Sequence, residues 1–411
     1  MSSCTTKRAA RVVSDLAHTV LSTLRKKDDA FILKTGIRRF FVVRGYEEVA
    51  DFLKKWKYDT STRRVIRSLD FSTMYTSLPL LNLKDDLRKA FEEAWDFAAE
   101  ELNVDVEQVL LQWSGSKNSV FTKSTARNVR PKTALTFTLE EFVELVNWLV
   151  DNTYISNGGQ CRRQRQGMPM GTNYAPPICD LFLYVHESSH IDQLLLEDKI
   201  EEAKAYHLTF RLIDDVLSID NPLYEDLVKS YPSYLTAEET SLPDGANFIG
   251  MSIRSGPNNQ IELGVYDKRK DFPFKVVRYP NLASEIPTNI PYGVFIGQLY
   301  RFYRICSAII GAVVEAVSLA STLFKQGAKI RRLLQCFYCF VRKRGKRKHW
   351  SEALFESTLR ERVALDCSEK LNFSSKTRSN SSGRFRSRSK TCSSIRCNVS
   401  TLNWEHPNME L

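Results

Sequence analysis

The chain has 411 residues, 43% hydrophobic and 11% aromatic, which is enough for one large domain or two to three ordinary ones. Its 59 lysines and arginines outnumber its 48 aspartates and glutamates, giving a net charge of +11. This surplus favours a polyanionic partner, either nucleic acid or an anionic membrane surface, without choosing between them. The nine cysteines are irregularly spaced and Met1–Lys7 is polar, so we expect reduced thiols and an intracellular protein, nuclear or cytoplasmic.

The first part of the chain alternates helical patterns with one buried strand. Apolar residues at helical spacing cover Arg8–Arg25 and Tyr46–Tyr58, and Leu80–Leu102 predicts a charged amphipathic helix. Arg64–Phe71 predicts a buried strand. This strand ends in an acidic residue, Asp70.

Capping signals mark two further helices. Thr138–Glu141 has the capping-box pattern and precedes a helical apolar face. Asn157–Gly171 is rich in glycine, glutamine and arginine, so we expect a loop there. Pro176–Pro177 suits the first turn of a helix that runs towards His190.

The most informative segment is Thr209–Ile219, in which two adjacent aspartates separate two short apolar runs. This pattern predicts a β-hairpin with an acidic tip at Asp214 and Asp215. A divalent cation would relieve the repulsion between carboxylates at such a tip, and hard oxygen ligands suit Mg²⁺. Farther along, Phe248–Arg254 and Ile261–Tyr266 predict two strands joined by a turn.

Helical patterns predominate from Tyr292 to about Arg347. Within them, Ile305–Phe324 is nearly continuously apolar and about as long as a bilayer is thick. Glu315 lies in its middle, where a charge is costly in a membrane, so a buried helix is favoured over a membrane span. Ser374–Lys390 is basic and of low complexity, which predicts disorder.

Three segments, in chain order, resemble the palm motifs of a reverse transcriptase of the Penelope-like retroelement type. Asp70–Pro79 resembles motif A, Gln166–Pro176 motif B and Ile213–Asp215 motif C. The glycines of the second segment let the backbone approach a base or sugar closely. The similarity continues through Gly293–Phe302 and covers roughly residues 1 to 345.

The resemblance implies an RNA-directed DNA polymerase, a nucleotidyltransferase that extends a DNA primer with dNTPs on an RNA template. Asp70 and Asp214 would bridge two Mg²⁺ ions, for which Mn²⁺ can substitute, and Asp215 would support them. Lys268 would act as the general acid towards pyrophosphate, with Lys270 an equal candidate. An ordinary surface lysine is the alternative for both.

The resemblance also implies a nucleotide pocket and a helical contact with nucleic acid. Tyr75 would be the steric gate that excludes a 2′-hydroxyl, and Gly171 and Thr172 would line the pocket. Rings and charges alternate on one predicted helix, which suits stacking and backbone contact. We expect these contacts at Tyr300, Arg301 and Arg304. A core tyrosine at position 75 and an ordinary amphipathic helix are the structural alternatives.

The expected fold is α+β, with a reverse-transcriptase palm of antiparallel sheet and packed helices, a helical thumb and incomplete fingers. We assign residues 1–60 to the fingers remnant and N-terminal helices, 61–280 to the palm, 281–348 to the thumb and 349–411 to a basic, largely disordered tail. The expected partners are an RNA template, a DNA primer and dNTPs. We expect neither a membrane nor a protein partner.

The chain departs from the family pattern in three ways. Leu212 stands where the family usually has tyrosine, and the fingers motifs are not seen before the N-terminal helix. A Gly-Ile-Tyr…Tyr-Ile-Gly endonuclease signature is also not seen. We therefore expect weakened nucleotide binding and a partial copy of a retroelement protein.

Two other functions compete with this interpretation. The first is a catalytically inactive, retroelement-derived protein that binds nucleic acid without polymerising. The second, more remote, is a zinc protease, because His186–His190 matches H-E-x-x-H on a predicted helix with Glu187 as the general base.

Overall fold

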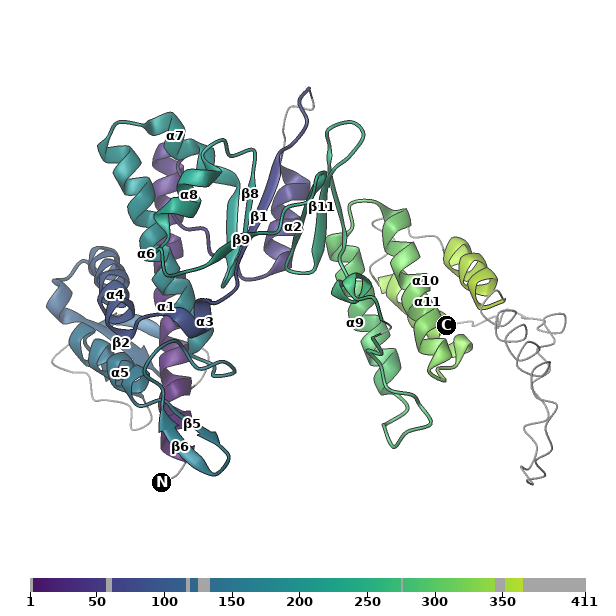
Figure 1. The fold of residues 1–411 in the computed structure, drawn as a ribbon, viewed down its shortest axis with the longest axis horizontal. Helices are drawn as coiled ribbons and strands as arrows, with labels where there is room; N and C mark the ends of the chain where they lie inside the picture. Colours follow the sequence, from purple (N-terminus) through teal and green to yellow (C-terminus); the bar gives the residue numbers. More distant parts are fainter. Residues whose placement is uncertain are drawn as a thin grey trace. The chain divides into compact units, whose positions relative to one another are not determined.

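The computed structural model describes residues 3–56, 61–115, 119–124, 134–274, 276–343 and 352–364 (Figure 1). Residues up to Ser357 form one compact unit, which contains every feature discussed below. The predicted tail lies outside the described residues, apart from a helix over 352–364.

A four-stranded antiparallel sheet lies at the centre of this unit, with the strand order β7-β8-β1-β9. Its strands are β1 (Ile66–Phe71), β7 (Thr209–Leu212), β8 (Asp215–Ile219) and β9 (Ala237–Glu239). The predicted strand and the predicted acidic hairpin are therefore both confirmed. A parallel bridge from Val42 to Arg211 covers the outer edge of β7.

Long helices cover one face of the sheet and enclose the main core (Figure 1). They are α1 (Ser3–Thr35), α4 (Leu80–Leu102), α5 (Leu139–Asp151) and α6 (Ala175–Leu196). Leu16, Trp95, Phe142 and Phe182, one from each helix, are completely buried there. The predicted capping box of α5 is present, since Thr138 accepts from the Glu141 N–H and the Glu141 side chain accepts from the Thr138 N–H.

A second core covers the opposite face of the sheet. It lies between α2 (Tyr46–Lys55) and a three-stranded sheet of β10 (Gly245–Phe248), β11 (Met251–Ser255) and β12 (Ile261–Val265). Along β8, Val216 enters the main core and Leu217 enters this second core. Because both faces are covered, neighbouring apolar residues of β8 serve different cores instead of alternating with solvent-facing ones.

The strand predicted over Phe248–Arg254 is confirmed from Met251 on, as β11 paired with β12, but its start is wrong. The chain turns at Ile249 and Gly250, both with positive φ, and forms the β10–β11 hairpin. The predicted loop after Asn157 also contains a strand, because β5 (Tyr154–Asn157) and β6 (Gln160–Arg163) form a second hairpin. Its tip carries two glycines with positive φ.

The remaining elements are small or C-terminal. A third sheet consists of β2 (Val109–Trp113), β3 (Val120–Lys123) and β4 (Leu135–Phe137). Short helices are α3 (Met74–Ser77), α7 (Ile200–Lys204), α8 (Tyr224–Ser230) and the 3₁₀ turns η1 (Val106–Gln108), η2 (Ala205–Leu208) and η3 (Lys268–Asp271).

Helices α9 (Ile290–Ile305), α10 (Ile309–Lys325) and α11 (Ile330–Lys343) pack together, as the helical pattern predicted. The long apolar stretch at Ile305–Phe324 is interrupted between α9 and α10. In the described part of the chain, no helix has the length and apolar character that crossing a bilayer requires.

Candidate active site

The three predicted acids meet where β1 lies beside the β7–β8 hairpin. In the register of the two strands, Asp70 is directly opposite Asp215. The backbone N–H of Phe71 donates to the backbone oxygen of Asp214 over 3.2 Å. Strand pairing thus brings a carboxylate from one part of the chain beside two from a distant part.

The carboxylates repel one another. Burial, followed by repulsion from Asp214 and Asp70, raises the pKa of Asp215 to about 6. Burial and the charge of Asp214 also raise the pKa of Asp70. Lys268, exposed on η3, opposes both shifts, so its ammonium lies within electrostatic reach of the two acids. The side chain of Lys270 lies outside the described residues.

The raised pKa of Asp215 predicts a dependence of stability on pH. In the folded chain this pKa is about 6, against 3.8 for an unperturbed carboxyl, so the folded state holds the proton more tightly. The resulting stabilisation is complete below the lower value and is lost as pH rises through the higher one. We expect the Tm of the metal-free wild type, relative to Asp215→Asn, to fall between about pH 4 and about pH 7. A difference in Tm between the wild type and Asp215→Asn that stays constant across this pH range in thermal melts would contradict this.

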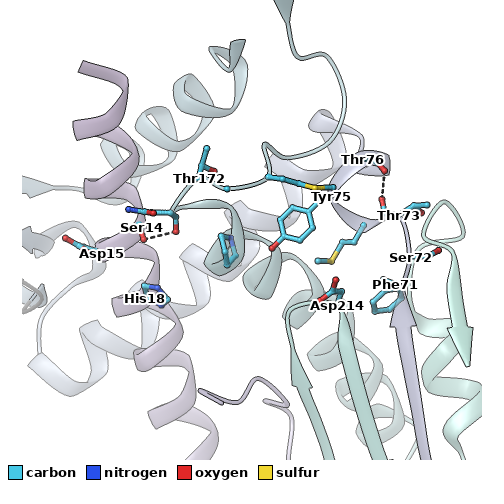
Figure 2. A pocket seen from close by; sticks show the side chains of 15 residues that line it. Ser14, Asp15, His18, Phe71, Ser72, Thr73, Tyr75, Thr76, Thr172 and Asp214 are labelled. Carbon is cyan, nitrogen blue, oxygen red and sulfur yellow. Dashed lines mark hydrogen bonds between the residues drawn. The ribbon is translucent and has the colours of Figure 1, made fainter. Parts of the chain in front are cut away.

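A cavity of about 1030 Å³ opens beside the acids. Asp214 and the segment Phe71–Thr76 line one side, Met170–Asn173 lines another, and α1 contributes Ser14, Asp15 and His18. Figure 2 shows the Tyr75 ring extending into this space, with Asp214 beside it. Among the described residues that line the cavity there is no lysine or arginine, so a bound triphosphate would need its charge balanced by cations.

The predicted nucleotide loop (Gln166–Asn173) is joined by backbone hydrogen bonds to α3 and to Leu78, the residue that follows α3. Gly167 N–H donates to Leu78 O over 2.8 Å, and Met168 N–H donates to Tyr75 O over 2.7 Å. Gly167 has φ +77°, and a Cβ there would lie 2.3 Å from the Tyr75 oxygen. Only glycine fits this close approach, which fixes the loop against the backbone of Tyr75.

Gly171 and Thr172 lie farther along the same loop, and both line the cavity. Gly171 has φ +83°, but a Cβ there would meet open space. The Thr172 hydroxyl donates to Pro169 O over 3.0 Å, so towards a ligand it can act only as an acceptor.

The carboxylate oxygens of the site fit Mg²⁺ if only one or two of them bind the ion directly. Within the described ranges, no three His, Cys, Asp or Glu side chains gather into a group that could hold a metal. Mg²⁺ commonly keeps several waters and binds through one or two carboxylates plus substrate phosphates. The hard oxygens of Asp70 and Asp214 suit that mode, in which the phosphates of a nucleotide complete the coordination.

The three residues predicted to contact nucleic acid lie on α9, away from the acids in sequence, and each has a partner within the chain, Arg304 through an ion pair with Glu47 at 3.8 Å. Arg301 donates to Gly250 O over 2.8 Å. The Tyr300 ring meets Phe340 edge to face, with centroids 5.1 Å apart. Arg304 keeps 53% of its side chain exposed. Their contact with nucleic acid stays a prediction, and Arg304 is the best placed of the three.

The H-E-x-x-H motif does not form a zinc site, so the zinc-protease alternative is wrong. His186 Nε2 lies 3.2 Å from an Asp86 carboxylate oxygen. His190 Nε2 lies 2.8 Å from the Tyr206 hydroxyl. Glu187 is completely buried and bound to an arginine, so it cannot reach a substrate or activate a water.

No protein-family model matches the chain, and no curated protein matches it. Among solved structures it is similar to telomerase from Candida albicans in complex with the TWJ fragment of telomeric RNA, with a TM-score of 0.45 and 12% identity over 86% of this chain and 52% of that one. For apo telomerase from Candida tropicalis the TM-score is 0.44 with 16% identity over 86% and 54%. For the form truncated from the C-terminal domain it is 0.39 with 18% identity over 62% and 45%.

The chain thus spans about half the length of the telomerase chains it resembles. At these TM-scores the likeness carries no conclusion about this chain.

Sequence reasoning missed the contribution of α1 to the cavity. Ser14 donates to Asn173 O over 2.9 Å, which joins the helix to the nucleotide loop. Asp15 accepts from the indole N–H of Trp113 over 2.9 Å. Ser14 and His18 lie four residues apart on the cavity side of the helix, and this polar interruption of an apolar stretch is the signal that could have identified them.

Proposed function

We propose that the chain is the polymerase domain of a reverse transcriptase, extending a DNA primer with deoxynucleotides on an RNA template. The observation that carries this is the pairing of Asp70 with Asp215, beside Asp214, at a nucleotide-sized cavity. The order and content of the three motifs support a retroelement origin of the Penelope-like type.

The chemistry assigned to the site is an in-line displacement at the α-phosphorus of the dNTP. The primer 3′-oxygen bonds to phosphorus and gives its proton to solvent water, while the bond to pyrophosphate breaks. Two Mg²⁺ ions, when bound, stabilise the attacking and leaving oxygens. Asp70 and Asp214 would supply carboxylate oxygens to hold them, and Asp215 would add negative charge beside both. The Lys268 ammonium gives its proton to the departing pyrophosphate.

Tyr75 is proposed to select deoxyribose. Its side chain is half-buried and lines the cavity beside Asp214 and Thr172, so it would occupy the space that a 2′-hydroxyl needs. We expect Tyr75→Ala to increase ribonucleotide incorporation relative to deoxynucleotide by at least about tenfold.

Tyr75→Phe is the matched control, because it keeps the ring and should keep the selection. Single-nucleotide extension with matched dNTP and rNTP measures the ratio. An unchanged ratio for Tyr75→Ala would remove the gate role while leaving the polymerase proposal intact.

The α9–α11 helices are proposed as a thumb that holds the primer–template duplex. Arg304 is exposed, and Tyr300 keeps 36% of its surface exposed. A cation and a ring on one helix suit contact with phosphates and with an unpaired base. The net charge of +11 gives such contacts a favourable electrostatic background.

Binding without catalysis remains the second candidate, because the cavity lining described above has no cationic side chain for a triphosphate. Primer extension on an RNA template with Mg²⁺ and dNTPs decides between the two. Incorporation by the wild type supports the polymerase. Salt-dependent binding of the same primer–template without any incorporation would overturn it in favour of the binding protein.

A further inference from the structure

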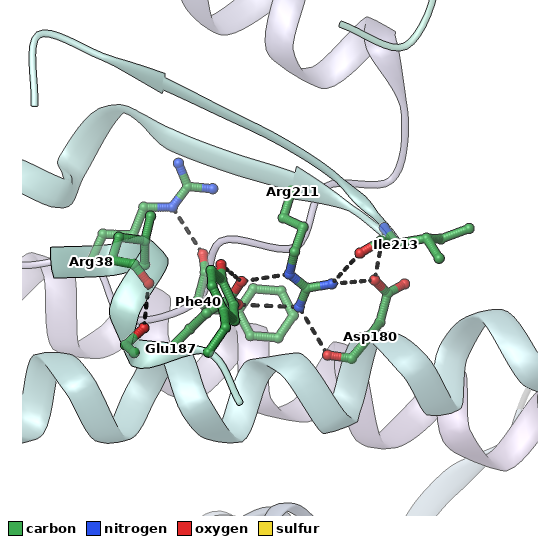
Figure 3. A network of polar contacts seen from close by, with 9 residues as sticks. Arg38, Phe40, Asp180, Glu187, Arg211 and Ile213 are labelled. Atoms are coloured by element: carbon green, nitrogen blue, oxygen red, sulfur yellow. Dashed lines mark hydrogen bonds and ion pairs between the residues drawn. The ribbon is translucent and has the colours of Figure 1, made fainter. Parts of the chain in front are cut away.

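A buried ion cluster lies directly behind the acidic hairpin. Arg211 on β7 has no exposed surface, and Glu187 on α6 has none either. The guanidinium donates to the Glu187 carboxylate over 2.5 and 3.1 Å and to Asp180 Oδ1 over 2.7 Å. Tyr231 adds a hydrogen bond to Glu187 over 2.8 Å. Figure 3 shows the guanidinium between the two acids of the helix.

The same cluster holds the residue that precedes the catalytic pair. Ile213 occupies the first central position of the two-residue turn that joins β7 to β8. Its φ is +56°, a conformation that hairpins usually give to glycine and that a β-branched side chain disfavours. Such strain persists only where the surroundings impose it, and it concentrates at functional sites.

Both peptide groups of Ile213 are bound by buried side chains. Its N–H donates to Asp180 Oδ1 over 3.1 Å, and its carbonyl accepts from Arg211 Nη1 over 3.2 Å. Asp180 therefore binds the strained N–H and the arginine at once. The next residue in the chain is Asp214, so the direction of its carboxylate depends on how Ile213 is held.

Stability alone gives a weak reason for this arrangement. A buried ion cluster can often be replaced by packed apolar side chains without loss of stability, because desolvating the charges offsets their attraction. An apolar core behind the hairpin would not bind the Ile213 peptide groups. The polar cluster is therefore explained by what it does to the turn.

We propose that Asp180 and Arg211 are positioning residues that hold Ile213 in the left-handed conformation and thereby aim Asp214 at Asp70. This rests on the proposed function, since the aim matters only if the two acids share a cation. Glu187 and Tyr231 complete the support by fixing the guanidinium from the side away from the turn.

The test combines Asp180→Ala, which removes the acceptor, with Ile213→Gly, which adopts positive φ without help. We expect Asp180→Ala to lower the kcat of primer extension and the Mn²⁺ affinity measured by electron paramagnetic resonance, each by about 10- to 100-fold. The KM for dNTP should change little. In the double variant with Asp180→Ala and Ile213→Gly, kcat and Mn²⁺ affinity should each be at least about tenfold higher than in Asp180→Ala alone.

Two further variants guard against a general loss of folding. Asp180→Asn keeps an oxygen acceptor for the Ile213 N–H, so its losses should be smaller than those of Asp180→Ala. Asp86→Ala removes another buried carboxylate, which lies on α4 and binds Lys89 and His186. It should lower the Tm without lowering the Mn²⁺ affinity of the folded protein.

The outcomes separate the two proposals. Suppose that the wild type binds Mn²⁺ and extends primers. If Asp180→Ala then does both equally well, or if adding Ile213→Gly does not restore its losses, the positioning role is overturned. The polymerase proposal stands in either case. If the wild type binds Mn²⁺ without extending primers, the affinities alone still decide the positioning role. A wild type that binds no Mn²⁺ overturns both.

Discussion

Asp214→Asn and Asp70→Asn are each expected to reduce primer extension by at least about 10³-fold, or about 4 kcal/mol of transition-state stabilisation. Each keeps the side-chain shape and the strand pairing of β1 with β8, but removes one of the charges on which cation binding depends. Burial, followed by repulsion among the acids, raises the pKa values of Asp70 and Asp215, so their ionised carboxylates destabilise the fold. Without divalent cations, both variants should therefore melt at a higher temperature than the wild type.

This opposite movement of activity and stability distinguishes a catalytic acid from a structural one. Mg²⁺ should stabilise the wild type and leave the variants nearly unchanged, because a ligand that binds only the folded state raises its stability. Asp226→Asn is the control, since this exposed acid on α8 pairs with Lys229. Two results would contradict catalysis at this site. One is full activity in Asp214→Asn. The other is a lower Tm for the variants than for the wild type, together with a wild-type Tm that does not change on adding Mg²⁺.

Gly167→Ala is expected to be the most destabilising single-methyl change in the nucleotide loop, with a loss of about 3 kcal/mol or more in the free energy of unfolding. The added Cβ would lie 2.3 Å from the Tyr75 oxygen and 2.9 Å from the Thr76 Cα, and the φ of +77° is itself unfavourable for alanine. Both contacts are with backbone, so no side-chain rotation relieves them. Urea denaturation measures the loss.

Gly171→Ala is the matched control in the same loop. Its φ of +83° is equally unfavourable, but a Cβ there meets no atom within 4 Å. We expect it to cost about 1–2 kcal/mol, the backbone contribution alone. Equal losses in the two variants would show that the close approach of the loop to Tyr75 contributes nothing to the difference in the free energy of unfolding.

The Gly167→Ala protein that still folds should also select deoxynucleotides less well, because Tyr75 would be displaced.

Local signals predicted the pieces of the site well. An acid at a strand end, two acids at a hairpin tip and a capping box each depend on neighbouring residues, and β1, the β7–β8 hairpin and α5 have that form. Their convergence is different, because no spacing in the sequence brings Asp70 to Asp215. Only the resemblance of the ordered motifs to a known family predicted it.

The features that sequence analysis missed share a physical cause, which is that tertiary contacts overrode local pattern. All four residues of β6 are exposed, so the hairpin has no apolar alternation to reveal it. Ile249 takes a positive φ against its own preference, which hid the turn within the predicted strand. A glycine at position 250 was the available clue.

The buried cluster left a fainter trace. Arg211 interrupts an apolar strand, and Asp180 and Glu187 lie seven residues apart on one face of a helix whose intervening residues are mostly apolar. Charges in such places are rarely buried unless they are paired. The sequence could have suggested that they meet, but their bond to the Ile213 backbone depends on the turn geometry.

The pairing of β1 with β8 has a consequence for how a newly made chain acquires its chemistry. Helices α4, α5 and α6 lie between these strands in sequence and can form from local contacts while the ribosome is still working. Strand β1 gains its partner only after the β7–β8 hairpin has been synthesised. A nascent polypeptide that ends before this hairpin therefore holds only one of the three acids, Asp70, and under the proposed function it could not catalyse nucleotide addition until translation has passed the hairpin.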